Sequence, residues 1–425
     1  MIDISATLDA RNGLSRTFAI GAPRPPVELL WQTVVELDRP GDPDDESLPP
    51  SARYVGAGAY SRSDSVLRGA GEAVERAALH PARGTLEGTV RGRRADLGPA
   101  ALAYDRPDLA LGAPGTADHE LTWYPARRLR DGAPLLVPAG LVDWPCADDE
   151  APTFDPGPSG AASGAGYDMA LRNALLEMIE RDAVMVAWER GLHLPRIAPP
   201  ESGTGPTGRA VAALLSTAAA AGLRVVLARV PTAFPDLCCG VAVVVDEWGG
   251  GRAAAVGCKV SEDPARSVLG ALQEGLQVRG LLRNTRGDGP PPDVPARIHD
   301  ENDRVAFMLA TEGTDSIVGW TADFTPPTPL SAGRARRPTV DDLVAGLVAD
   351  GADPLVVDLT ARLPARIRAM GWAAVKVVPA GYQHLRMDEE KDWSWNRPRL
   401  ATAEARTGLV ATFAPGQRRR PHPLP

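Results

Sequence analysis

Lysine is scarce in this sequence of 425 residues: only three of its 46 basic residues are lysine, and the rest are arginine. Lys259, Lys376 and Lys391 all lie outside any Gly-x-x-x-x-Gly-Lys-Ser/Thr pattern, so the sequence contains no phosphate-binding loop of that kind. The formal net charge is −8 at pH 7. This charge argues against a protein that binds nucleic acid by neutralising its phosphates, and we expect no nucleic-acid partner.

Cysteine is also scarce. The four cysteines form no C-x-x-C pair and the six histidines are scattered, so a structural zinc site is not expected. Met1–Ser5 lacks the basic start and apolar core of a signal peptide. The apolar runs, such as Ala210–Ala221, are too short or too interrupted to cross a membrane. We therefore expect a cytoplasmic protein with reduced thiols and no membrane association.

Apolar residues make up 44% of the chain, which is ample for a large core. Helical and strand-like patterns alternate, so we predict a mixed fold of the α/β (α+β) class. Residues 355–378 have the strand–helix–strand order of a βαβ-like unit. Asp64 and Asp168 are candidate N-caps of two helices. The predicted helices cover about 64–79, 168–189, 210–221, 264–282, 340–348 and 361–370, and the predicted strands cover 54–60, 120–124, 135–142, 223–230, 240–245, 253–260, 355–359 and 373–378.

Two of the predicted helices carry the same motif, a pair of glutamates three residues apart followed by arginine. The first is Glu72-Ala-Val-Glu75-Arg76, and the second is Glu177-Met-Ile-Glu180-Arg181. Residues three apart lie on one helix face, roughly 5–6 Å apart at Cβ. On a surface helix such a motif usually means solvated charge. Here the flanking residues are apolar, and a carboxylate beside a buried face is costly unless a metal ion or arginine compensates it.

A third helix has the related spacing Glu274, Gln277 and Arg279. If the three faces converge, their carboxylates could hold magnesium ions and their guanidinium groups could bind phosphate. The small-residue loop predicted at 156–166, which contains Ser163, leads into the second motif helix. Helix N-termini after such loops bind phosphate. These patterns together predict a nucleoside-triphosphate site built without a phosphate-binding loop.

The motifs and their order resemble the YcaO superfamily over about residues 50–425. The sequence Gly-Glu-Ala-Val-Glu-Arg is followed by Ala-Leu-Leu-Glu-Met-Ile-Glu-Arg-Asp-Ala and Leu-Gln-Glu-Gly-Leu-Gln-Val-Arg. Val-Val-Asp-Leu-Thr, Val-Lys-Val-Val-Pro and a final Pro-x-Pro-x-Pro come later. The final prolines are similar to those of the azoline-forming branch, the cyclodehydratases of thiazole/oxazole-modified peptides.

This resemblance implies an ATP-binding fold and assigns roles to residues. It implies that Mg²⁺ is held by Glu72, Glu75, Glu177 and Glu180. It also implies that ATP contacts, directly or by fixing the carboxylates, come from Arg76, Ser163, Arg181, Glu274, Gln277 and Arg279. The carboxylate of Pro425 is a candidate for proton transfer or for ordering the site. The chain departs from the family at Gly69, where serine is usual, and at Pro379-Ala-Gly-Tyr382, where Val-Pro-Gly-Leu is usual.

The implied substrate is a ribosomal precursor peptide whose Cys, Ser or Thr becomes thiazoline or oxazoline. The expected organisation is an N-terminal segment, 1–50, packed on or leading into a catalytic domain, 51–425, that ends in a proline-rich tail, 415–425. Because no extra leader-binding domain is evident, we expect a separate ThiF-like partner, and the resemblance implies a homodimer. Two alternatives stay open: thioamide or macroamidine synthesis by the same amide phosphorylation, and a scaffold subunit that no longer turns over ATP.

Overall fold

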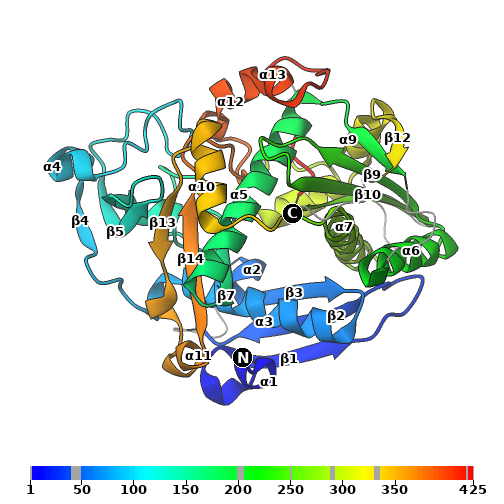
Figure 1. Cartoon of the computed structure of the whole chain (residues 1–425), viewed down its shortest axis with the longest axis horizontal. Coiled ribbons are helices and arrows are strands. Elements are labelled where there is room, and N and C mark those ends of the chain that lie inside the picture. The colour runs from blue at the N-terminus through cyan, green and yellow to red at the C-terminus, as the bar shows by residue number, and fades with distance from the viewer. Residues whose placement is uncertain are drawn as a thin grey trace.

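A computed structural model describes residues 2–39, 49–198, 205–248, 251–287, 292–329, 336–417 and 420–424. Within these residues the strands form three sheets, and helices pack between and around them (Figure 1). The prediction of a mixed α/β fold is confirmed.

The first sheet is antiparallel, in the order β1-β2-β3, and it joins the N-terminal residues to the first motif helix. Helix α3 (Arg62–Leu79) follows β3 directly and packs on this sheet. The side chain of Ser61 caps α3 by accepting a hydrogen bond from the Asp64 amide at 3.1 Å. Asp64 itself lies in the first turn, so its predicted role as the cap is wrong. The other elements here are α1 (Ile4–Thr7), β1 (Ser15–Gly21), β2 (Trp31–Leu37), α2 (Pro50–Arg53) and β3 (Tyr54–Ala59).

Gly69 lies where α3 presses on β2. A Cβ atom added to Gly69 would lie 2.8 Å from the Cγ2 atom of Thr33. The hydroxyl of Thr33 is held by the buried hydroxyl of Ser65 at 2.7 Å, which in turn donates to the carbonyl of Ala57 at 3.0 Å. Glycine therefore permits the close contact between helix and sheet. The departure from the family's serine at this position has a packing reason in this chain.

The second sheet has the order β11-β10-β9-β8-β12. β10 and β11, which contain the predicted strands 240–245 and 253–260, pair along their whole length as an antiparallel hairpin, and residues 249 and 250 lie outside the described residues. Helix α7 (Pro264–Arg286), which carries the third motif, packs on these two strands and is capped by Asp263. The remaining elements are β8 (Pro195–Ala198), α6 (Gly205–Ala220), β9 (Arg224–Val230), β10 (Cys238–Trp248), β11 (Gly251–Ser261), α8 (Glu301–Leu309), α9 (Thr311–Ala322) and β12 (Thr325–Pro329).

The third sheet has the order β4-β5-β13-β14-β7, with β6 paired to β5, and it overturns two predictions. β13 and β14 are antiparallel neighbours, so residues 355–378 are not a βαβ unit. The connecting helix α11 (Ala365–Ala369) is too short for a parallel crossover. Part of the predicted loop at 156–166 is a strand, β7, because it pairs with β14. The strands are β4 (Val90–Arg93), β5 (Glu120–Arg128), β6 (Pro134–Pro138), β7 (Ala161–Ala165), β13 (Leu355–Asp358) and β14 (Trp372–Val378).

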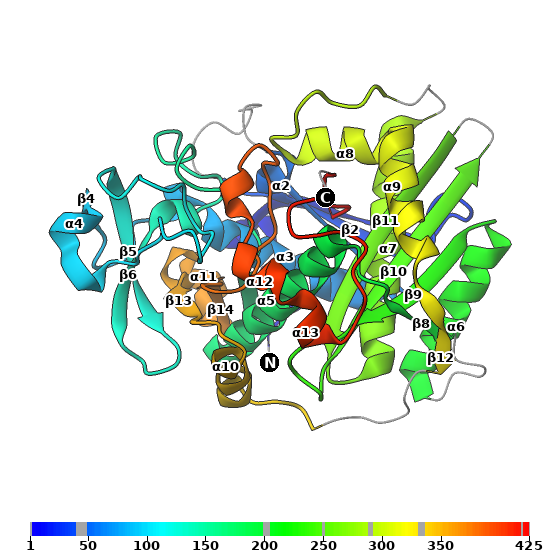
Figure 2. The ribbon, with the colours of Figure 1, turned by 90° about the horizontal axis from the view of Figure 1, so that it is seen from above.

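Helix α5 (Tyr167–Arg190) lies between the second and third sheets at the centre of the molecule (Figures 1 and 2). It starts at Gly166 without a side-chain cap, and Asp168 lies in its first turn, so the predicted Asp168 cap is wrong. Among the described helices, none combines the length and apolar character that a membrane crossing would need. Four short helices complete the list: α4 (Arg94–Leu97), α10 (Val340–Ala349), α12 (Arg397–Ala401) and α13 (Ala403–Thr407).

The packing of Gly69 makes a prediction about stability. Gly69→Ala should lower the free energy of unfolding by about 1–2 kcal/mol, because the collision with Thr33 outweighs the gain in helix propensity. The matched control is Gly319→Ala in α9, where an added Cβ meets nothing within 4 Å, and this variant should gain up to about 1 kcal/mol. Urea unfolding curves measure both variants. Equal stabilisation by both substitutions would contradict the packing argument.

Candidate active site

The helices that carry the three motifs, α3, α5 and α7, surround one cavity of about 720 Å³. Their side chains enter it from three directions, since α3 packs on the first sheet, α7 on the second, and α5 lies between the second and third. We call this cavity the interhelical cleft. The predicted site residues that line it are Glu72, Glu75, Arg76, Ser163, Glu177, Glu180, Arg181, Glu274 and Gln277.

The carboxylates from α5 and α7 are held by the hairpin strand β11. Glu180 is buried and accepts a hydrogen bond from the Val260 amide at 2.7 Å. Glu274 accepts one from the Cys258 amide at 2.6 Å. Arg181 lies between these two carboxylates, with its guanidinium 4.0 Å from Glu180 and 3.9 Å from Glu274. Strand β11 therefore fixes one oxygen of each glutamate, while the second oxygen is not bonded to a strand amide.

On α3, Arg76 donates two hydrogen bonds to Glu72, at 2.8 and 3.0 Å. Its third nitrogen, Nη1, is buried and has no hydrogen-bond partner among the described residues. Burial raises the pKa of the Glu75 carboxyl well above its ordinary value, and the neighbouring Glu72 adds to the rise. The Arg76 guanidinium opposes this rise in pKa but does not overcome it. Among the described residues, this wall of the cleft therefore has a donor without a hydrogen-bond partner and a carboxyl that holds its proton more tightly than usual.

Glu177 faces the same wall from α5. It accepts hydrogen bonds from the hydroxyl of Ser159 at 3.3 Å and from Arg181 at 3.5 Å. The buried Lys376 on β14 donates to the carbonyls of Gly157 and Ser159, at 2.8 and 2.6 Å, and so fixes the segment that holds Glu177. Burial lowers the pKa of Lys376 to about 8, against the opposing effect of Glu177 and Glu75.

Ser163 and Gln277 line the cleft but are already engaged with the main chain. Ser163 lies on strand β7, not in a loop, and its hydroxyl donates to the carbonyl of Gly71 at 2.8 Å. Gln277 accepts from the amide of Gly58 at 2.6 Å and donates to the carbonyl of Gly56 at 3.0 Å. Each of these side chains ties one wall of the cleft to another, so their position supports the site's shape.

Arg279 is the one predicted residue with a described side chain that does not line the cleft. It is buried on another face of α7 and pairs with Asp246 of β10 at 2.6 Å. Its guanidinium also donates to the carbonyl of Val27. Arg279 therefore joins α7 to the second sheet and to the loop between β1 and β2, and we leave it out of the proposed ATP site.

Several polar residues that were not predicted also line the cleft: Arg68, Asn173 and Lys259. Arg68 lies one turn before Glu72 on α3, and Asn173 lies one turn before Glu177 on α5, so helical spacing could have indicated both. Lys259 comes from strand β11 and lies 3.5 Å from Glu180. No sequence pattern indicates Lys259 as a site residue, because it comes close to Glu180 only when β11 packs against α5.

The segment 420–424 lies beside α5 and α8 (Figure 2). Its last described residue, Leu424, lines the cleft. His422 is fully buried; its amide donates to Glu389 at 3.2 Å, and its carbonyl accepts from Arg304 at 3.1 Å. Arg304 and Glu389 pair with each other at 2.8 Å. The main chain is therefore directed into the cleft at Leu424. Pro425 itself lies outside the described residues, and its predicted role stays a prediction.

The cleft suits an ion that is shared with phosphate more than an ion held by protein alone. Among the described residues, no three acidic, histidine or cysteine side chains come together closely enough to hold a metal ion. Mg²⁺ commonly binds through one or two carboxylates, with phosphate oxygens and waters as its other ligands. The separated glutamates and the unpartnered Nη1 of Arg76 fit this arrangement.

The match to a known family covers residues 56–383, and the family is described as YcaO cyclodehydratases that bind ATP and Mg²⁺. The chain belongs to the YcaO family. The matched residues include all three motif helices. ATP and Mg²⁺, the cofactors implied by the sequence resemblance, are those of this family. No match was found among proteins of curated function.

Solved structures show the same fold at low sequence identity. A heterocyclase in complex with substrate and cofactor is 16% identical to this chain, with a TM-score of 0.74. The match covers 99% of this chain and 56% of the heterocyclase chain. This chain thus spans little more than half of that protein. YcaO from Methanopyrus kandleri, bound with AMPPCP and Mg²⁺, is 19% identical with a TM-score of 0.61, and the match covers 97% of this chain and 94% of that protein. A chain of the E. coli microcin synthetase McbBCD complex is 12% identical with a TM-score of 0.59, and the match covers 86% of this chain and 87% of that chain.

The raised pKa of Glu75 predicts an inverse relation between stability and activity. Because the folded state holds the Glu75 proton more tightly than the unfolded state, the free energy of unfolding falls as pH rises from the ordinary carboxyl pKa through the raised one. Glu75→Gln removes this loss and should be more stable than the wild type at pH 8.

The same Glu75→Gln variant should lose Mg²⁺-dependent ATP turnover, because it lacks a carboxylate that the ion would use. Thermal unfolding between pH 5 and pH 8 measures the stability, and phosphate release measures the turnover. The surface variant Glu247→Gln is the control for both. A pH dependence of stability identical in wild type and Glu75→Gln would contradict this account of Glu75.

The contacts of His422 predict how segment 420–424 is held. Arg304→Met should speed amide hydrogen exchange in this segment at least roughly tenfold, because it removes the charged donor to the carbonyl of His422 and the ion pair with Glu389. Arg304→Lys, which keeps the charge, should restore part of the protection. Arg397→Met, which breaks an exposed pair with Asp392, is the control. Unchanged exchange in a folded Arg304→Met variant would show that other contacts hold the segment.

Proposed function

We propose that this chain is an ATP-dependent peptide cyclodehydratase that converts Cys, Ser or Thr of a ribosomal precursor peptide into thiazoline or oxazoline. The observation that carries the proposal is the interhelical cleft, where glutamates from three separate helices and three arginines line one cavity. A structure with these carboxylates facing open solvent in different directions would have removed the basis for a shared nucleotide site.

The proposed reaction phosphorylates a backbone amide. The Cys, Ser or Thr side chain attacks the carbonyl carbon of the preceding residue, and the resulting hemiorthoamide oxygen takes the γ-phosphoryl group of ATP. Phosphate then leaves as the ring C=N bond forms, so the peptide loses one water while ATP becomes ADP and phosphate. Amide oxygen is a poor leaving group, and its phosphorylation is the reason for consuming ATP.

The protein's part in this reaction is to position groups and balance charge, as in other phosphoryl transfers. Mg²⁺ would be held by the oxygens of Glu180 and Glu274 that β11 does not bond and by the carboxyls of Glu75 and Glu177, all of which line the cleft. When bound, Mg²⁺ would neutralise charge on the phosphate oxygens. Nη1 of Arg76, which has no partner among the described residues, is a ready donor to a phosphate oxygen. Arg181 lies between Glu180 of α5 and Glu274 of α7 and offsets their mutual repulsion.

We propose that a separate protein delivers the precursor by binding its leader. The sequence resemblance implies a ThiF-like partner, and a neighbour of the same fold is a microcin synthetase complex. The homodimer that the resemblance implies stays a prediction.

The test is to incubate the chain, its partner and ATP with a candidate precursor. A loss of one water per modified residue, with one phosphate released each time, is the expected result. Glu177→Gln and Glu180→Gln should each abolish both signals, because each removes a carboxylate from the cleft. Glu247→Gln, on the surface, should have no effect.

Other products would contradict the proposal in recognisable ways. Replacement of oxygen by sulfur in the presence of sulfide would identify thioamide synthesis, and ligation of an amine would identify amidine synthesis. Absence of ATP use by the wild-type chain, with the partner and precursor present, would favour a scaffold subunit. Full activity without any partner would exclude the delivery protein.

A further inference from the structure

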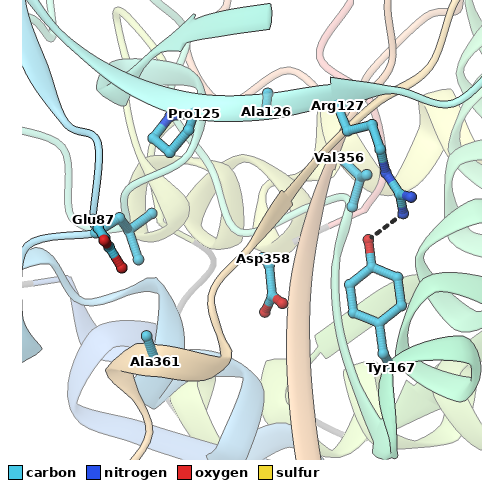
Figure 3. Close-up of a pocket in the computed structure, with 9 residues that line it drawn as sticks. Glu87, Pro125, Ala126, Arg127, Tyr167, Val356, Asp358 and Ala361 are labelled. Atoms are coloured by element: carbon cyan, nitrogen blue, oxygen red, sulfur yellow. Dashed lines mark hydrogen bonds between the residues drawn. The ribbon is translucent and has the colours of Figure 1, made fainter. Parts of the chain in front are cut away.

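A second cavity, of about 500 Å³, lies in the third sheet and contains none of the predicted site residues (Figure 3). It opens where strands β5 and β13 diverge. These strands pair only at Leu355 with Arg128 and at Val356 with Arg127, and beyond that point β13 continues beside β14. We call this cavity the strand wedge. Leu86 and Val356 form buried apolar walls.

The main chain of Asp358 faces the wedge. In an antiparallel pair, successive residues direct their N–H and C=O groups to opposite sides of the strand. The amide of Leu359 donates to Ala374 of β14 at 2.9 Å, so the preceding residue, Asp358, directs its main-chain groups to the other side, toward β5. The register of β5 and β13 ends before Asp358. On the facing strand lies Pro125, which has no N–H. The wedge thus contains a strand edge that β5 does not pair.

Two carboxylates face the same space. Glu87 and Asp358 lie on opposite sides of the wedge, and neither forms an ion pair with any residue that the structure describes (Figure 3). The single cation among the lining residues, Arg127, donates instead to the hydroxyl of Tyr167 at 3.2 Å and lies 5.9 Å from the centre of its ring. Thr360 donates its amide to one oxygen of Asp358 at 2.8 Å, which fixes the carboxylate in place.

We propose that the strand wedge binds an extended peptide segment with a basic side chain. The segment's main chain would pair with Asp358 as an added strand, and its cationic side chain would lie between Glu87 and Asp358, with its methylenes against Leu86 and Val356. An anionic ligand is disfavoured by the two unpaired carboxylates. The free edge of Asp358 favours a peptide over a small amine, since an amine would leave that edge unpaired.

This inference rests on the proposed function, because a peptide-modifying enzyme must hold its substrate outside the residue that reacts. The wedge and the interhelical cleft flank the first turn of α5, which contributes Tyr167 to the wedge and Met169 to the cleft. A bound segment of the precursor would therefore be anchored beside Tyr167, ten residues before Glu177 on the same helix.

The experiment measures fluorescence anisotropy of the full chain with labelled peptides that place one test residue between Ser-Val and Val-Ser. The lysine peptide should bind, and peptides with norleucine or glutamate in its place should bind at least roughly fivefold more weakly. Methylating the lysine's own amide nitrogen or that of the next residue, in separate peptides, should weaken binding in one of the two, because successive amides face opposite sides of a strand and one of them faces Asp358.

The variants Glu87→Gln and Asp358→Asn should each weaken binding of the lysine peptide about three- to tenfold while leaving the norleucine peptide unaffected. Both residues are exposed, and asparagine keeps an oxygen for Thr360, so the fold should persist in a thermal unfolding control. Asp96→Asn, at an exposed acid on α4 outside the wedge, is the matched control.

Equal binding of the lysine and norleucine peptides, or unchanged lysine-peptide affinity in both variants, would overturn the proposal. Glu177→Gln separates this outcome from failure of the proposed function. The Glu177→Gln variant should lose ATP use and still bind the lysine peptide. If the strand wedge does not bind the precursor, the Glu87→Gln and Asp358→Asn variants should still remove water from the precursor at the wild-type rate.

Discussion

Mutual repulsion among the glutamates of the interhelical cleft is the constraint on which the site depends. Five acidic side chains from α3, α5 and α7 face one cavity, and like charges placed close together in a partly buried space are unfavourable. The protein separates them with guanidinium groups and main-chain amides. Arg76 holds Glu72, Arg181 lies between Glu180 and Glu274, and Glu75 responds by keeping its proton more tightly.

This balance leaves specific groups without partners, and these define what the cleft can accept. Among the described residues, Nη1 of Arg76 has no acceptor, while the single guanidinium of Arg181 is shared by Glu177, Glu180 and Glu274. A ligand that carries anionic oxygens together with a divalent cation would provide an acceptor for Arg76 and a positive charge for the glutamates. The absence of a protein-only metal cage among the described residues follows from the same separation of the carboxylates.

Much of the site could be predicted because helices repeat regularly. Residues three or four apart share a helix face whatever the fold, so Glu72 with Glu75, Glu177 with Glu180, and Glu274 with Gln277 could be paired from spacing alone. Their convergence in one cleft required the family resemblance. Arg279 shows the limit of spacing, since two further residues along α7 turn its side chain toward Asp246 and away from the cleft.

The strands were predicted less well, because whether a segment forms a strand, and in which direction it pairs, depends on the neighbouring strand. Ala161–Ala165 has the composition of a loop, yet it forms a strand since β14 offers it an edge. The order strand–helix–strand suggested a parallel crossover at 355–378, but the short α11 only reverses the chain. Lys259 and Lys376 enter the site region from strands, where no helical spacing marks them, and the close contact at Gly69 depends on how α3 settles on Thr33.

Helix α5 has 24 residues and a length of about 36 Å, and it contributes side chains to three separate regions of the molecule. Its first turn borders the strand wedge, its middle supplies Glu177 and Glu180, and near its end Trp188 donates to the carbonyl of Arg420. A rigid rod of this kind transmits axial displacement without loss. Any displacement of α5 along its axis, between its two flanking sheets, would thus shift a wall of the strand wedge, the glutamates of the cleft and the contact with Arg420 together.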